Sequence, residues 1–294
     1  MADKTINSAA MIVNAQSRKG RDLFEQARAA LRDLPFAVDA RAVADPEALD
    51  GTVREALAAR PDLLILGGGD GTISGLVDHL VGTGTALAVL PFGTANSFAR
   101  TLGIPLDLEG AVEVIRSGRR QRIDLGMIDD DYFANFAAIG ISPEIARTVP
   151  DKLKRHLGRA GYVGWAALQY ARFRPFTLTV DDGTARRTLR ALEVRISNGR
   201  YQGGTELVDA ASVTSGEIVV QAVTGHFKRR LLRNWAASVL RLDARHDDTI
   251  DFTGRSLRIE TVPPLPISID GEVLARTPVT ARVAAGAIEV MVPG

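Results

Sequence analysis

The sequence contains no cysteine among its 294 residues and carries almost no net charge. The absence of cysteine excludes disulfides, thiolate metal sites and cysteine nucleophiles, and it fits a reducing compartment. A formal net charge of +1 argues against a nucleic-acid binder whose affinity depends on a large basic surface. We therefore expect no nucleic-acid partner.

A long uninterrupted apolar segment is also missing. The longest uncharged run, residues 80–99, contains several glycines, Pro91 and polar side chains. It predicts a buried segment rich in turns rather than a membrane helix. Residues 1–7 lack the basic region and apolar core of a secretory signal. We expect a cytoplasmic protein that is soluble or peripheral at the inner face of the membrane.

Apolar strands alternate with amphipathic helices in the first part of the chain. The patterns predict strands at residues 11–13, 36–42 and 63–66, and helices at residues 22–33, 46–59 and 106–117. Asp45 is the expected cap of the second helix and Pro46 its first residue. This alternation predicts an open, doubly wound parallel sheet with its ligand at the carboxyl ends of the strands.

Short β-rich segments separated by glycine turns replace this pattern after about residue 125, which predicts an antiparallel sandwich. The expected strands are residues 132–141, 176–180, 189–197, 217–223, 257–259, 267–269 and 288–292. The fold class is therefore α/β followed by all-β.

A glycine-rich turn, Gly67, Gly68, Gly69, Asp70 and Gly71, follows the third strand. Its glycines leave backbone N–H groups uncovered, and a helix is expected to begin near Thr72, so the turn attracts phosphate. A carboxylate beside phosphates would repel them, so Asp70 indicates a divalent cation or orients a donor within the loop. The turn lacks the lysine of a Walker A site, and Thr72 replaces the third glycine of a dinucleotide fingerprint. The chemistry it favours is phosphoryl transfer.

Three blocks in the same order resemble those of diacylglycerol-kinase-type lipid kinases, a family that includes bacterial YegS/DgkB-like and sphingosine-kinase-like proteins. Residues 68–72 resemble the GGDGT signature, which NAD kinases and phosphofructokinases share. Residues 91–100, PFGTANSFAR, resemble the P-x-G-T-x-N-D-F-A-R block of the lipid kinases. Residues 269–272, IDGE, resemble their C-terminal D-G-E.

The resemblance implies an ATP-dependent lipid kinase of phospholipid metabolism that transfers the γ-phosphate to the hydroxyl of a diacylglycerol-like or sphingoid-like lipid, with ATP and Mg²⁺. It also implies a domain layout. Residues 1–125 would form a NAD-kinase-like nucleotide-binding domain, which residues 285–294 rejoin. Residues 126–284 would form the β-sandwich that holds the lipid.

The resemblance also assigns roles to individual residues. Glu272 would accept the proton of the lipid hydroxyl, with Asp270 supporting it and Asp70 beside the Mg²⁺. Asp124 could join the metal network, and a capping or hinge role is the alternative. Ser97 and Arg100 would contact the acceptor lipid. The residues expected to bind nucleotide are Asn14, Lys19, Gly67, Gly68, Gly69, Asp70, Gly71, Thr72, Thr94 and Asn96.

The sequence departs from the family at three positions. Gly75 replaces a glutamate, Ser97 replaces the aspartate of the second block, and Ser215 stands where bacterial members have an aspartate that holds a structural magnesium. These departures leave open a catalytically silent nucleotide or lipid sensor. A NAD kinase is the other alternative, although the Phe-Ala-Arg run after Ser97 argues against it.

A basic amphipathic helix is predicted within residues 227–242. Phe227, Leu231, Trp235 and Val239 recur every four residues, and lysine and arginine occupy the other side. Such a helix packs on the sandwich or lies on an anionic membrane, and both hold if the packed helix leaves its arginines facing headgroups. The expected partner is a lipid substrate at a membrane surface, and a homodimer stays open.

Overall fold

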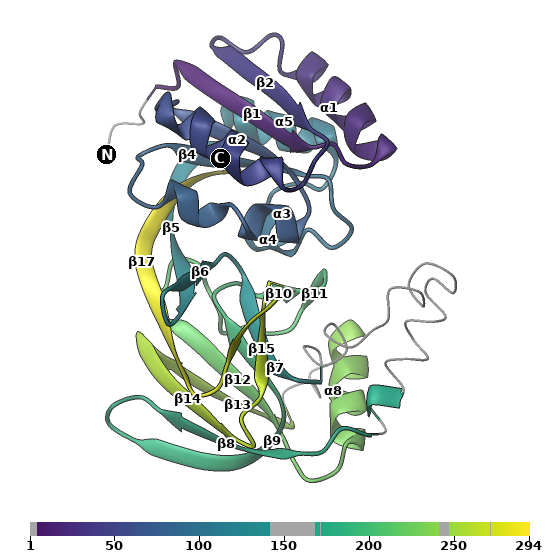
Figure 1. The fold of residues 1–294 in the computed structure, drawn as a ribbon, viewed down its shortest axis with the longest axis vertical. Helices are drawn as coiled ribbons and strands as arrows, with labels where there is room; N and C mark the ends of the chain where they lie inside the picture. Colours follow the sequence, from purple (N-terminus) through teal and green to yellow (C-terminus); the bar gives the residue numbers. More distant parts are fainter. Residues whose placement is uncertain (1–4, 142–167, 171, 241–246, 271) are drawn as a thin grey trace.

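The computed structural model describes residues 5–141, 168–170, 172–240, 247–270 and 272–294. Figure 1 shows an α/β domain above a β-rich domain, with long strands running from one into the other. The predicted fold class, a parallel α/β sheet followed by a β-sandwich-like domain, is confirmed.

The first domain is built on a parallel sheet whose strands follow the order β4-β3-β1-β2. Its inner strands are apolar without alternation because helices cover both faces of the sheet. The elements are β1 (Ser8–Asn14), α1 (Arg18–Ala30), β2 (Ala37–Val43), α2 (Ala48–Ala58), β3 (Leu63–Gly68), α3 (Asp70–Ser74), the 3₁₀ helix η1 (Val77–Leu80), β4 (Ala86–Pro91), α4 (Ser97–Thr101) and α5 (Leu108–Ser117).

The predicted start of α2 was wrong. The helix begins at Ala48 and not at Pro46, and the residue before it, Glu47, makes no side-chain cap. The Asp45 carboxylate instead accepts the N–H of Glu47 at 3.1 Å. Residues 46–47 form a turn before the helix, so Asp45 closes that turn rather than capping α2.

The second domain continues the sheet with antiparallel strands that enclose their own apolar core. A helix, α8, packs on one outer face of these strands, beside β12. None of the described helices is long and apolar enough to cross a membrane. The elements are β5 (Arg119–Ile128), β6 (Asp131–Phe133), β7 (Phe136–Gly140), β8 (Phe176–Asp181), β9 (Arg186–Ser197), β10 (Tyr201–Gln202), β11 (Thr205–Glu206), β12 (Ile218–Thr224), α8 (Arg229–Val239), β13 (Thr249–Gly254), β14 (Ser256–Val262), β15 (Pro266–Ile269), β16 (Glu272–Arg276) and β17 (Val279–Val292).

Two long strands, β5 and β17, join the domains. The first part of β17 pairs with β14 of the sandwich, and its end pairs in parallel with β4. Along most of its length it also pairs antiparallel with β5. Among the described residues one continuous sheet of 15 strands results, so the two domains share hydrogen-bonded backbone and not only a flexible link.

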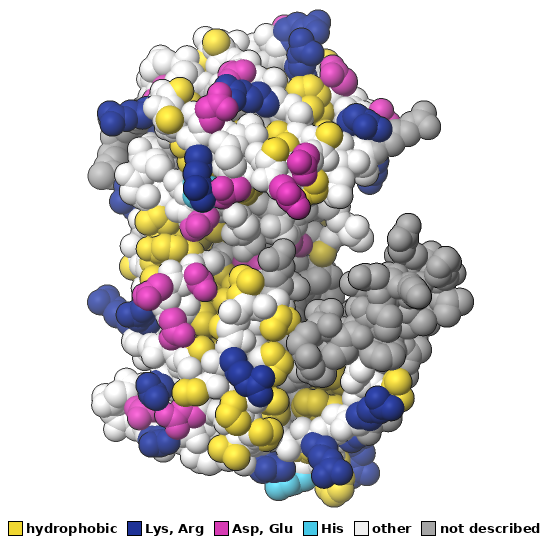
Figure 2. All heavy atoms as spheres, in the orientation of Figure 1, with side chains coloured by type: hydrophobic (Ala, Val, Ile, Leu, Met, Phe, Trp, Pro, Cys, Tyr) yellow, Lys and Arg dark blue, Asp and Glu magenta, His cyan; other side chains and the backbone are white. Residues whose placement is uncertain are grey.

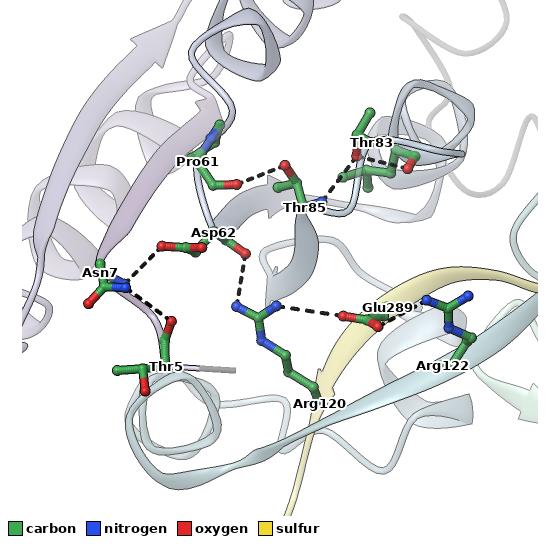
Figure 3. A network of polar contacts seen from close by, with 10 residues as sticks. Thr5, Asn7, Pro61, Asp62, Thr83, Thr85, Arg120, Arg122 and Glu289 are labelled. Carbon is green, nitrogen blue, oxygen red and sulfur yellow. Dashed lines mark hydrogen bonds and ion pairs between the residues drawn. The ribbon is translucent and has the colours of Figure 1, made fainter. Parts of the chain in front are cut away.

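A polar network fixes the end of β17 in the first domain (Figure 3). Glu289 of β17 lies 3.2 Å from the guanidinium of Arg122 and 3.6 Å from that of Arg120, both on β5. Arg120 also donates to the carbonyl of Asp62 at 3.2 Å, just before β3. The Arg120 side chain is only 8% exposed, whereas that of Arg122 is 64% exposed, so water screens the contacts of Arg120 less than those of Arg122. Through Arg120 the network links β5 and β17 to the residue before β3.

A matched pair of glycine substitutions tests how tightly the first domain is packed. A Cβ at Gly93 would lie 2.5 Å from the Cα of Gly69 and 2.7 Å from the Oδ1 of Asn96, whereas a Cβ at Gly51 in α2 meets nothing within 4 Å. We expect Gly93→Ala to lower the free energy of unfolding by about 1–3 kcal/mol. Gly51→Ala should raise it by about 0.5–1 kcal/mol because alanine favours the helix.

Urea titrations of both variants measure these changes. Equal stabilities for Gly93→Ala and the parent protein would show that the backbones at Gly69 and Gly93 do not pack as closely as described.

Candidate functional site

Two loops lie side by side at the carboxyl ends of β3 and β4: the glycine loop, residues 67–71, and the second loop, residues 91–96. The two strands pair in parallel, so Gly68 lies opposite Pro91. A Cβ on Gly69 would come within 3.2 Å of the Cα of Gly93. A Cβ on Gly93 would lie only 2.5 Å from the Cα of Gly69, so this approach of backbone to backbone requires glycine at position 93, and the loops form one surface lined by peptide groups.

Asp70 connects the glycine loop to α4, the helix that follows the second loop. One of its carboxylate oxygens, Oδ1, accepts the backbone N–H of Phe98 in α4 at 3.1 Å. This donor lies in α4 and not within the glycine loop, so the two roles that the sequence left open for Asp70, a divalent cation or a donor within the loop, both stay predictions. The bond uses one carboxylate oxygen, so the other can still serve a cation.

A pocket of about 190 Å³ lies beside the glycine loop. Asn14, at the end of β1, donates from its amide to the Thr72 hydroxyl at 3.2 Å. Lys19, at the start of α1, is exposed at the pocket rim. The structure thus brings together residues that the sequence assigned to nucleotide binding, together with polar neighbours that it did not. The pocket is lined by Asn14, Gln16, Ser17, Lys19, Gly20, Leu23, Gly68, Gly69, Thr72 and Phe92.

Other predicted residues shape the second loop from within. Asn96 adopts a left-handed backbone conformation with φ of 49°, and its side chain is bonded to the N–H of Gly93 at 2.9 Å and the carbonyl of Pro91 at 3.1 Å. Arg100 donates to the carbonyl of Ala95 at 3.0 Å. Both side chains hold the loop in shape, and direct contact with nucleotide or lipid stays a prediction for them. Thr94 is exposed at the loop tip.

Asp270, in the turn between β15 and β16, reaches the first domain. Its carboxylate accepts a hydrogen bond from the hydroxyl of Ser74 at the end of α3, across 196 positions in the sequence. It also accepts the backbone N–H groups of Ala134 and Phe136, each at 3.1 Å. The acidic turn therefore faces the helix that continues from the glycine loop.

Burial raises the pKa of the Asp270 carboxyl to about 6, although the bonds from Ser74 and the backbone around Phe136 act in the opposite direction. Its backbone φ of 44° is a left-handed conformation, which aspartate tolerates better than most residues. From this backbone conformation the side chain reaches Ser74 at the end of α3.

Glu272 begins β16, and its backbone lies opposite Ile269 in the β15–β16 ladder. The placement of its side chain lies outside the described part of the structure. Its backbone position, two residues after Asp270, puts Glu272 at the same turn. Its role as proton acceptor stays a prediction.

Ser97 connects the second loop to the β10–β11 hairpin. Its side chain is buried, and its hydroxyl oxygen accepts the N–H of Gly204 at the hairpin tip at 3.0 Å. At this position the sequence departs from the aspartate of the family block. Here the residue anchors a hairpin of the second domain, and lipid contact by Ser97 stays a prediction.

Asp124 lies where β5 crosses between the domains. Its two carboxylate oxygens accept the N–H groups of Gly216 and Gly286, both at 2.7 Å. These bonds tie β5 to the loop before β12 and to the irregular part of β17. The arrangement favours the hinge role that the sequence left open, and metal binding by Asp124 stays a prediction. Within the described ranges, no three His, Cys, Asp or Glu side chains form a group that could hold a metal ion.

Sequence reasoning missed Ser74 and Asn135. Ser74 lies one position before the Gly75 departure and carries the contact to Asp270. Asn135 is buried, accepts the Thr101 hydroxyl at 3.0 Å, and donates to the carbonyl of Tyr201 in the hairpin. Neither residue belongs to a recognisable motif, so the tertiary structure was needed to find them.

Comparison with known proteins gives consistent matches. Residues 8–128 match the model of the diacylglycerol kinase catalytic domain, and residues 136–292 match that of the YegS C-terminal NAD kinase beta sandwich-like domain. A Yersinia enterocolitica protein named "Probable lipid kinase YegS-like" is 30% identical over 235 residues, covering 72% of this chain and 79% of the relative.

Two further matches extend over nearly the whole chain. A Salmonella typhimurium protein named "Probable lipid kinase YegS" is 29% identical, over 96% of this chain and 95% of its own. The crystal structure of a diacylglycerol kinase from Bacillus anthracis superposes with a TM-score of 0.76 at 20% identity, covering 98% of both chains. This last likeness concerns the fold.

The pKa of Asp270 generates a prediction about stability. Its folded-state value, about 6, lies above the ordinary value of 3.8, so the native state holds the proton more tightly than the unfolded chain. Ionisation therefore costs stability: the cost is absent below the ordinary value and complete above about pH 6. We expect the unfolding free energy of Asp270→Asn, relative to the parent protein, to rise across that interval in urea titrations.

Asp182→Asn is the matched control. Bonds from the Thr184 hydroxyl and the backbone N–H of Ala185 lower the pKa of Asp182, so its contribution is lost as the pH falls. The difference in unfolding free energy between Asp270→Asn and the parent protein should therefore change as the pH rises above 3.8, the ordinary pKa of the carboxyl group. The corresponding difference for Asp182→Asn should change as the pH falls below 3.8. A difference for Asp270→Asn that is constant with pH would contradict the burial of its carboxyl group.

Proposed function

This chain belongs to the family of YegS-type lipid kinases with a diacylglycerol kinase catalytic domain, and from this premise we propose that it transfers the γ-phosphate of ATP to a lipid hydroxyl. The observation that carries the proposal is the bond between Ser74 and Asp270. It brings the acidic turn of the second domain against the helix that follows the glycine loop. The N–H groups that would bind phosphate and the group that would accept the hydroxyl proton would thereby face the same space.

The glycine loop and its pocket would bind the phosphates of ATP. Uncovered N–H groups of the loop donate to phosphate oxygens, and the exposed ammonium of Lys19 adds positive charge at the rim. Asn14 holds the hydroxyl of Thr72, so both side chains keep a fixed orientation before nucleotide arrives. The donors therefore need little rearrangement when phosphate binds.

The residues present fit a magnesium ion that is held mainly by phosphate. Mg²⁺ commonly uses one or two protein carboxylates together with substrate phosphates and water, and Asp70 offers its second oxygen beside the glycine loop. When bound, the ion would neutralise charge on the phosphate oxygens. Asp70 keeps its first oxygen on the Phe98 N–H, which fixes the direction of the carboxylate.

The acidic turn would handle the proton of the lipid hydroxyl. Phosphoryl transfer has a loose transition state, so most of the acceleration comes from positioning and charge neutralisation. A base is still needed as the new bond forms, and we assign this role to Glu272. Asp270 is engaged by Ser74 and two backbone N–H groups, so it would position the turn that carries Glu272.

Substitution of the two acidic residues tests the proposal. The amide oxygen introduced by Asp70→Asn can still accept the Phe98 N–H, so we expect this variant to fold normally and to lose the cation site. Glu272→Gln should lose proton acceptance. Each should lower the rate of phosphoryl transfer by about 10²–10⁴-fold. The measurement is transfer from γ-labelled ATP to diacylglycerol, phosphatidylglycerol, ceramide and sphingoid bases, beside thermal unfolding of each variant.

Asp130→Asn provides the control because the Asp130 side chain is fully exposed, 100%, on the surface. Its activity should equal that of the parent protein. A rise in melting temperature with ATP and Mg²⁺, without phosphorylation of any lipid in the panel, would instead identify a nucleotide sensor. Phosphorylation of NAD in preference to lipids would identify a NAD kinase.

A further inference from the structure

The inner side of α8 is fully occupied by packing on the second domain. Leu231 joins a small apolar cluster with residues of β9 and β12, and Asn234 and Ser238 are buried. The Asn234 amide accepts from Arg195 at 2.9 Å, and the Trp235 indole donates to Glu193 at 2.8 Å. These contacts account for why the helix lies on the sheet.

The outer side of α8 exposes apolar side chains that this packing does not explain. Leu232 is 48% exposed and Leu240 66% exposed, and with Ala236 between them they are spaced four residues apart along one side of the helix. Phe227, just before the helix, is 62% exposed. We call Phe227, Arg229, Leu232, Ala236 and Leu240 the outer face of α8.

Exposed apolar side chains are concentrated in this region. Among the described residues seven large apolar side chains are exposed, and three of them belong to the outer face of α8. A fourth, Leu168, lies two positions before Tyr170, whose carbonyl accepts the Lys228 ammonium at 2.9 Å. A concentration of this kind marks an interaction surface rather than scattered surface residues.

The same region is basic. Lys228, Arg229, Arg230 and Arg233 all lie in the first turns of the helix or beside it. Asp248 pairs with Arg233 and Arg230, whereas the Arg229 guanidinium lies over the Phe227 ring, 5.0 Å from its centroid. Figure 2 shows basic and apolar side chains side by side at the lower right of the molecule, where Figure 1 places α8.

The helix that carries this surface, α8, adjoins the site through the β10–β11 hairpin. The hairpin contacts α4 on one side through β10, and it contacts α8 through β11. Its tip, at Gly204, is bonded to Ser97 of the second loop. A bilayer on which α8 rested would therefore lie near the hairpin that contacts α4 and the second loop.

We propose that the outer face of α8 docks on an anionic lipid bilayer. Its leucines and Phe227 would enter the boundary between headgroups and acyl chains, and Arg229 would remain with the anionic phosphates. The apolar side chains of this face match the acyl region of a bilayer, and its cationic side chain matches the anionic headgroups. The purpose of docking, access to a lipid acceptor, rests on the proposed function, whereas vesicle binding can be measured without catalysis.

Co-sedimentation of the full chain with vesicles tests this proposal. The probes are vesicles of phosphatidylglycerol mixed with phosphatidylcholine, and vesicles of phosphatidylcholine alone. We expect the parent protein to bind the anionic vesicles more tightly and to be released by salt. The double variant Leu232→Glu/Leu240→Glu should bind them at least about 10-fold more weakly, and Arg229→Gln about fivefold more weakly.

Val262→Glu and Arg28→Gln are the matched controls, because Val262 is 69% exposed on β14 and the Arg28 side chain is 59% exposed on α1. Both should bind like the parent protein. Thermal unfolding of all variants identifies any loss that comes from misfolding. If the double variant unfolds, Arg229→Gln with its control decides the outcome.

Three results would overturn the proposal. One is equal binding of the parent protein to both kinds of vesicle, or binding to neither. Another is unchanged vesicle binding by the variants of α8. The third is a dimer in light scattering that the double variant abolishes, which would assign the face to a second copy of the chain. Phosphorylation of a short-chain diacylglycerol dispersed as monomers, measured on the same variants, separates failure of docking from failure of the proposed function.

Discussion

The carboxylate of Asp270 is the point at which the two domains meet at the site. It accepts hydrogen bonds from Ser74 of the first domain and from backbone N–H groups of the second, in a place where burial raises its pKa to about 6. A buried acceptor that serves several donors is costly to leave without them. The position of the acidic turn relative to the glycine loop therefore depends on the hydrogen bonds of this one side chain.

Two features of the backbone make that meeting possible. The long strands β5 and β17 carry hydrogen-bonded sheet from one domain into the other. Where their pairing is irregular, the Asp124 carboxylate accepts the N–H groups of Gly216 and Gly286. The glycine loop and the second loop approach so closely that a side chain at Gly93 would collide with Gly69. The first feature fixes the orientation of the domains, and the second leaves a surface of peptide groups for phosphate.

At two of the positions where the sequence departs from the family, the structure shows hydrogen bonds that hold the local backbone in place. Ser97 accepts the N–H of Gly204, so a residue of the second loop anchors the tip of a hairpin from the second domain. Gly216, beside Ser215, donates its N–H to Asp124, so backbone and carboxylate hold this loop together. For Gly75 nothing in the structure explains the replacement. The hairpin also contacts α8, which makes it the physical connection between the site and the surface proposed to meet the bilayer.

The sequence by itself determined the elements and the chemistry that local pattern encodes. Uninterrupted apolar runs predicted β1 and β3, helical spacing predicted α1, α5 and α8, and the glycine loop predicted phosphate binding, because each of these follows from residues close together in the chain. Tertiary structure alone decided which distant residues meet. The bond between Ser74 and Asp270 spans 196 positions, and the anchoring of Gly204 by Ser97 spans 107. No local pattern records such contacts, since they arise only when the long strands place one domain against the other.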